Sequence, residues 1–106
     1  MILVNTDFIS GKTLSTISIV KGSTIRSKHL GKDILAGLKM IVGGELTDYT
    51  DMINEARAIA TKRMVDEAVE MKADAVINIR YGTSNVAQGA AEVIVYGTAV
   101  KFINPL

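Results

Sequence analysis

The stretch from Gly43 to Ala75 constrains the fold more than any other part of this sequence. Its apolar residues recur at three- and four-residue steps, the spacing of one face of an α-helix. We expect the helix to begin near Thr47, whose hydroxyl can cap free backbone N–H groups, and to end at Lys72. It would be about 39 Å long at 1.5 Å per residue, whereas a compact domain of this size has a radius of gyration near ~13 Å. The helix must therefore lie across a sheet or project into a neighbouring subunit.

The apolar stripe predicted to be the buried face of this helix consists of Tyr49, Met52, Ile53, Ala56, Ala60, Met64, Ala68 and Met71. A shorter helix is predicted over residues 30–42, and Gly43-Gly44 would end it because glycine readily adopts the left-handed conformation. The three- and four-residue steps of both segments thus predict two consecutive helices.

Segments that favour β-structure lie on both sides of the helices, at residues 2–4, 14–25, 75–81 and 91–100. Ile77, Ile79 and Tyr81 alternate with polar residues, which is typical of a half-buried strand. Residues 91–100 are apolar on both faces, which predicts a central strand or one covered by another subunit, and residues 83–90 read as a polar loop. We therefore predict a single α+β domain over residues 1–106, in the order β-β-α-α-β-β, with the long helix packed on an antiparallel or mixed sheet.

Composition indicates self-association and excludes several classes of partner. Of the 106 residues, 48% are hydrophobic and only 22% are charged, more apolar material than a small monomer easily buries. A net charge of +1 with no basic stripe argues against nucleic acid. The chain has no cysteine, no apolar run long enough to span a membrane and no secretory signal, so we expect a cytoplasmic protein.

Four acidic residues offer a weak candidate metal site. Asp48, Asp51 and Glu55 share one face of the predicted helix, and Glu45 directly precedes it. Such a stripe could supply oxygen ligands to a divalent cation. The same charges would also complement the dipole at the amino terminus of the helix without any ligand, and this is the more ordinary interpretation. The single histidine, His29, is predicted to be a solvated loop residue.

A candidate ligand site combines Gly44, Glu45, Tyr49, Arg57 and Arg80. Arginine beside an apolar surface usually has a carboxylate partner, because its charge is costly to bury unpaired. The functional hypothesis is a pocket at a subunit boundary where the arginines and Tyr49 hold an anionic or aromatic ligand. The structural alternative, which we favour, is an ion pair between subunits.

Three blocks of the sequence, IVGGELTDYTDMINEARAIA, ADAVINIRY and EVIVYGTAV, resemble the YbjQ-like family of small bacterial proteins, described as "putative heavy-metal-binding". The similarity covers nearly the entire chain, and the blocks have the order and spacing of that family. The resemblance implies an α+β fold related to dodecin subunits and a ring-shaped homopentamer. It implies no established activity. Some relatives carry cysteine-bearing segments, which this chain lacks.

We recognise no set of catalytic residues in the sequence, because it contains no GxSxG motif and only one histidine. We therefore expect a non-enzymatic homo-oligomer that binds a small ligand or a divalent metal where subunits meet. The first alternative is an oligomeric scaffold without a ligand. The second is an enzyme whose site is shared between subunits and uses Glu45, Tyr49 and Arg57.

Overall fold

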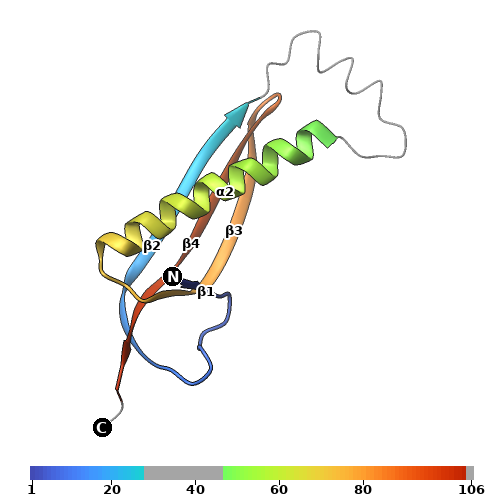
Figure 1. Ribbon diagram of the computed structural model, residues 1–106. Coiled ribbons are helices and arrows are strands. Elements are labelled where there is room, and N and C mark those ends of the chain that lie inside the picture. The colour runs from blue at the N-terminus through green and yellow to red at the C-terminus, as the bar shows by residue number, and fades with distance from the viewer. Residues whose placement is uncertain (28–46, 105–106) are drawn as a thin grey trace.

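The computed structural model describes residues 1–27 and 47–104 (Figure 1). Its elements are β1 (Ile2–Leu3), β2 (Thr13–Ser27), α2 (Thr47–Glu70), β3 (Ala75–Ala87) and β4 (Ala90–Ile103). The shorter helix predicted over residues 30–42 lies outside the described residues. The strands form one sheet in the order β1-β3-β4-β2, and α2 packs on it. The predicted α+β class is confirmed.

The sheet is mixed, because β1 runs parallel to β3 while the other neighbours are antiparallel. β4 lies between β3 and β2, so the prediction that residues 91–100 form a central strand is confirmed. Its two apolar faces have different surroundings. Val93 and Val95 are fully buried, whereas Ile94 and Tyr96 on the other face remain exposed.

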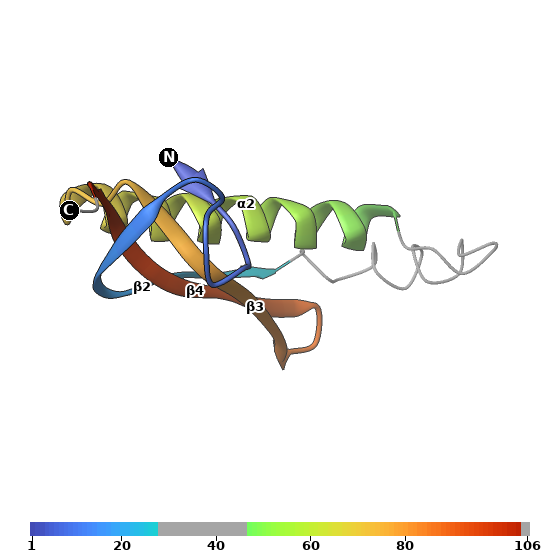
Figure 2. The same ribbon diagram turned by 90° about the horizontal axis from the view of Figure 1, so that it is seen from below.

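Helix α2 lies along one face of the sheet, over β2 and β4 (Figure 2). It begins at Thr47, as predicted. The predicted stripe provides the buried residues Met52, Ala56, Ala60, Met64 and Ala68. These pack against buried side chains of the sheet that include Val20, Val93, Val95 and Ala99. Three of the five helix residues are alanines, which lets the helix backbone approach β2 closely.

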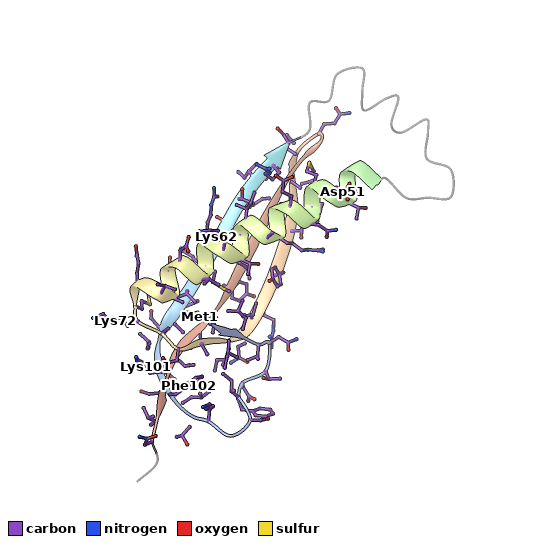
Figure 3. The ribbon with its side chains drawn as sticks, viewed as in Figure 1. Met1, Asp51, Lys62, Lys72, Lys101 and Phe102 are labelled. Carbon is purple, nitrogen blue, oxygen red and sulfur yellow. The ribbon has the colours of Figure 1, made fainter. Side chains whose placement is uncertain are left out.

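The carboxyl end of α2 is closed by backbone and side-chain hydrogen bonds (Figure 3). Lys72 adopts a left-handed conformation with φ 60°, and the N–H of Ala73 donates to the carbonyl of Ala68 at 3.0 Å. The Lys101 ammonium donates to the carbonyl of Lys72 at 2.9 Å, so a cation from β4 neutralises the negative end of the helix dipole. This closure fixes where the chain enters β3.

A bulge in β3 changes which residues share a face. The pairing with β4 shifts between Ile77 and Arg80, where Asn78 adopts φ 55°. As a result Ile79 packs beneath α2, whereas Ile77 packs on the opposite face. The prediction that Ile77, Ile79 and Tyr81 share one face is therefore wrong, because one extra residue reverses the alternation of the strand.

The prediction of a loop over residues 83–90 is also wrong, because β3 continues to Ala87 and a tight turn then leads into β4. Ala87 pairs with Ala90, so only Gln88 and Gly89 form the turn, and Gly89 has φ 71°. Pairing with the apolar strand β4 thus extends β3 through a polar sequence. In Figure 2 this hairpin curves away from α2.

The amino-terminal segment covers part of the sheet face opposite α2. There Ala75, Ile77 and Val100 form a second buried cluster, against which pack Val4, Ile9, Leu14 and Phe102. The Lys12 ammonium lies 5.0 Å from the centre of the Phe102 ring, a cation–π contact at the rim of this cluster. Within residues 1–27 and 47–104, no segment covers the other end of this face.

Candidate functional site

The uncovered part of the sheet carries an apolar patch, which we call the open sheet face. It consists of Ile19 (67% exposed), Ile25 (60%), Tyr96 (44%) and Ile94 (37%). Alternation along the strands places all four opposite α2, because their neighbours Val20, Thr24, Val93 and Val95 are buried beneath the helix. Large exposed apolar side chains gathered on one face are typical of an interaction surface.

Charged residues of both signs share this face. In the pairing of β2 with β4, Lys21 lies opposite Tyr96. Glu92 lies opposite Ile25, which follows Lys21 by four residues along β2 and points to the same face. Basic and acidic groups therefore lie on either side of Ile94. Such a face can present each charge to an opposite charge on a partner surface.

The outer edge of β2 is tied to α2 by helix side chains. The Lys21 N–H donates to Glu67 Oε1 at 3.3 Å, and the Arg63 guanidinium donates to the Ser23 carbonyl at 2.7 Å. An unpaired strand edge can pair with another chain, and charged side chains are a common way to block it. The middle of the β2 edge is therefore protected by this chain's own helix.

Among residues 1–27 and 47–104, only the beginning of the outer edge of β3 is covered by another segment. After β1, the N–H groups of Asn78 and Ile79 donate to the carbonyls of Thr6 (2.9 Å) and Val4 (3.2 Å). Within the described ranges, no strand pairs with this edge beyond Ile79. We call the segment from Tyr81 to Ser84 the open β3 edge.

A small hollow lies where the covered part of the β3 edge ends. Its volume is about 250 Å³, and its lining residues are Leu3, Val4, Asn5, Ile79 and Tyr81. The Tyr81 hydroxyl lies 2.9 Å from Thr61 Oγ1 of α2, so the ring is held on the helix side of the sheet. The hollow is lined mainly by apolar groups and contains no charged side chain.

The structure separates the predicted ligand residues. Arg57 is exposed on α2 and donates to Asn54 Oδ1 at 3.3 Å. Arg80 lies by register on the face opposite α2, and its guanidinium donates to the carbonyls of Asn5 at 2.9 Å and Ile79 at 3.0 Å. Arg80 therefore fastens the amino-terminal segment and does not meet Arg57 within one subunit.

The other predicted residues are described only in part. Gly44, Glu45 and His29 lie outside the described residues, as do the side chains of Asp48 and Tyr49. Tyr49 belongs to α2 by its backbone. The ligand site predicted around these residues therefore remains a prediction.

Of the four candidate metal ligands, two have described side chains. Asp51 is exposed near the amino end of α2 (Figure 3). The Glu55 carboxylate is paired with the Arg26 guanidinium of β2. Among residues 1–27 and 47–104, no three histidine, cysteine, aspartate or glutamate side chains gather where they could hold a metal ion. In that part of the chain Glu55 thus acts as a link between α2 and β2.

Sequence reasoning missed the open β3 edge, because residues 83–90 were assigned to a loop. A signal was present in the β-branched residues Thr83 and Val86, which favour a strand. The sequence did predict the part of the open sheet face that belongs to β4, because residues 91–100 are apolar on both faces. In the described part of the chain, no helix combines the length and apolarity needed to cross a bilayer.

The fold defines the class of protein: a small α+β domain in which one long helix covers one face of a mixed four-stranded sheet. The chain belongs to the YbjQ family, whose description is "Putative heavy-metal-binding" and whose model matches residues 1–103. This membership confirms the resemblance seen in the sequence. The family description names binding and not catalysis.

Relatives from distant microorganisms share nearly the full length of this chain. A UPF0145 protein of Alkaliphilus metalliredigens is 73% identical over 103 residues, which cover 97% of this chain and 100% of the relative. A UPF0145 protein of Methanosarcina acetivorans is 55% identical over 105 residues, or 98% of this chain and 99% of the relative. A solved structure from Pediococcus pentosaceus, a protein of unknown function in the DUF74 family, has a TM-score of 0.65 at 15% identity. It covers 97% of this chain and 98% of its own, and it supports the fold alone.

Proposed function

We propose that this protein is a non-enzymatic homo-oligomer that binds a metal ion or a small ligand where its subunits meet. The observation that carries the proposal is the open sheet face. Burying its four apolar side chains against another subunit would remove exposed hydrocarbon from water, at about 25 cal/mol per Å². Lys21 and Glu92 on the same face supply charges that a second copy can complement. We propose a ring of five copies, as the resemblance to the family implies.

The family description supports the binding part of the proposal. Asp51 is exposed near the start of α2, and no described residue forms an ion pair or hydrogen bond with its side chain. A ring would repeat this carboxylate, together with the neighbouring acidic residues of the sequence, around its axis. Hard divalent cations take several oxygen ligands, which repeated copies can supply.

A scaffold without a ligand is the second candidate, and a specific observation favours it. Three of the residues predicted to bind a ligand or metal already have partners within the same chain. Glu55 pairs with Arg26, Arg57 with Asn54, and Arg80 with backbone carbonyls. Each therefore has a structural role that needs no ligand. The two candidates share the same assembly and differ only in what the assembled ring retains.

Native mass spectrometry of the untagged protein, purified without chelator, tests both parts. The binding proposal predicts an oligomer with additional mass in whole-number proportion to its subunits. An oligomer without added mass, also after addition of Zn²⁺, Mn²⁺ or Ca²⁺, would favour the scaffold. A monomer at micromolar concentration would contradict the assembly itself.

A pair of variants tests the surface that carries the proposal. Ile94→Lys places a charge at the centre of the open sheet face and should reduce the assembly to smaller species, because the charge would be buried without a partner. Ala58→Lys adds the same charge to an exposed position of α2 and should leave the assembly unchanged. Equal masses for the two variants would show that the open sheet face is not the interface.

A further inference from the structure

We propose that Ile94 on the open sheet face of one subunit packs into the hollow beside Tyr81 of the next subunit in the ring. In the same contact, Glu92 of the first subunit forms an ion pair with Arg57 of the second. This inference rests on the proposed homo-oligomer and identifies the surface that the open sheet face meets. The occupant of the open sheet face is therefore a different surface of a second copy.

The symmetry of a ring is the first argument. Neighbouring subunits of a cyclic ring make heterologous contacts, in which one surface meets a different surface of the next copy. In a five-membered ring the copies differ by a rotation of about 72°, so the two contact surfaces of one subunit point at least about 108° apart. The open sheet face points away from α2. Its counterpart must therefore lie on the helix side of the sheet.

The hollow lies on that side, at the outer edge of β3. Ile79 packs in the cluster beneath α2, and Tyr81 is held by its hydroxyl against Thr61 of α2. Leu3 pairs with Val76, which also belongs to the cluster beneath α2, so Leu3 points to the same side. Three of the five residues that line the hollow thus face the helix side. The hollow therefore meets the condition that the ring sets.

Apolar complementarity is the second argument. The hollow has a volume of about 250 Å³ and is lined mainly by apolar groups, so it can accept a branched aliphatic side chain. Leu3 is 39% exposed and Tyr81 is 50% exposed in the single chain. On the exposed surface of α2, by contrast, Val69 is the only large apolar side chain among residues 50–70. The apolar counterpart of the open sheet face is thus found at the hollow and not on the outer surface of the helix.

A positive charge lies beside the hollow. Arg57 and Thr61 are four residues apart on α2, so their side chains are neighbours on one flank of the helix, with Cβ atoms about 5–6 Å apart. Thr61 contacts the Tyr81 hydroxyl, which places Arg57 next to the wall of the hollow. Arg57 is exposed, and its bond to Asn54 uses only one of its five N–H donors. The guanidinium can therefore bind a carboxylate as well.

The third argument is that the open sheet face carries a carboxylate at a matching distance. Glu92 lies two residues from Ile94 along β4, about 7 Å away on the same face. No described residue forms an ion pair or hydrogen bond with the Glu92 side chain. When Ile94 lies against Tyr81 in the hollow, Glu92 therefore comes within reach of Arg57. An arginine and a glutamate that lack a charged partner in the single chain thus neutralise each other across the contact.

Chemical cross-linking tests which surfaces meet, because the native chain has no cysteine. The double variant Asn5→Cys/Ile94→Cys places one thiol at the hollow and one on the open sheet face. A short bis-maleimide should convert it to a ladder of covalent products that ends at five chains on a denaturing gel. Each single variant should remain monomeric on the gel, because its thiol meets no second thiol. A dimer of Ile94→Cys alone would show that the open sheet face packs against its own copy, and would overturn the contact.

Charge reversal tests the ion pair. Glu92→Arg and Arg57→Glu each place like charges opposite one another and should raise the protein concentration needed for half-assembly by about tenfold or more. The double variant restores opposite charges and should return this concentration to within about threefold of the wild-type value. Glu70→Arg makes the same charge change at an exposed position of α2 and should assemble like the wild type.

The outcomes separate this contact from the proposed function. A double-cysteine protein that forms an intact oligomer without cross-linking would overturn the contact while the homo-oligomer stands, and so would a charge-reversed double variant that assembles no better than the single variants. A wild-type protein that is monomeric at micromolar concentration would overturn both. Circular dichroism of each variant confirms that the subunit is folded.

Discussion

Replacing Gly22 by alanine tests the closest contact between α2 and β2. A Cβ atom at this position would lie 2.0 Å from the carbonyl oxygen of Ala60 and 2.6 Å from the nitrogen of Met64. Both are main-chain atoms of α2, so no side-chain rotation relieves the clash. Ordinary van der Waals contact begins at 3.4 Å, and the helix would therefore have to move away from β2 by about 1.4 Å, the difference between the two distances.

A displacement of this size loosens the core. Met64 and Val20 are fully buried between α2 and the sheet and would lose part of their packing. Overpacking of a core commonly costs about 1–3 kcal/mol, and a clash with main chain belongs at the upper end. We expect a loss of about 3 kcal/mol, which lowers the Tm of a small domain by roughly 12–24 °C.

Thermal unfolding followed by circular dichroism measures this loss. All samples need the same protein concentration, because assembly makes the Tm concentration-dependent. Gly82→Ala is the matched control, since a Cβ there meets no atom within 4 Å and its φ is ordinary. It should leave the subunit unchanged or stabilise it by up to ~1 kcal/mol. A Gly22→Ala protein that melts within about 2 °C of the wild type would refute the close packing of α2 on β2.

Two further predictions concern the core and the amino-terminal segment. Met64→Ala removes a fully buried side chain beneath α2 and should cost about 2–5 kcal/mol, measurable by urea unfolding, whereas Val69→Ala at a 57% exposed position should cost far less. Arg80→Ala removes the hydrogen bond to the Asn5 carbonyl and should speed hydrogen exchange at the amides of Asn78 and Ile79, which bond to the same segment; unchanged exchange would show that Arg80 does not fasten it.

Elements specified by local sequence could be predicted, and α2 is the clearest case. Thr47, where the helix begins, and the stripe from Met52 to Ala68 all belong to the helix itself. A three- to four-residue period needs no knowledge of distant residues. The central position of β4 was likewise visible, because apolar residues on both faces require a neighbour on each side.

Features that depend on pairing between distant segments could not be predicted. The bulge at Asn78 depends on the alignment of β3 with β4, and no local pattern in residues 75–81 specifies it. The same pairing carries β3 through the polar residues from Thr83 to Ala87. Two residues of the candidate ligand site are separated for a related reason. Arg57 and Arg80 are both near apolar residues in sequence, yet the bulge and the helix place them on different sides of the sheet.

The bulge also explains how the single strand β3 contributes to two surfaces. Before Asn78, β3 is covered by β1 and the amino-terminal segment, and Ile77 packs in the cluster opposite α2. After it, Tyr81 turns to the helix side, and no described strand pairs with the outer edge. A strand without the bulge would place Tyr81 on the same face as Ile77, away from Thr61 of α2. The position of a single extra residue therefore determines that Tyr81 faces the helix and that Arg80 faces the amino-terminal segment.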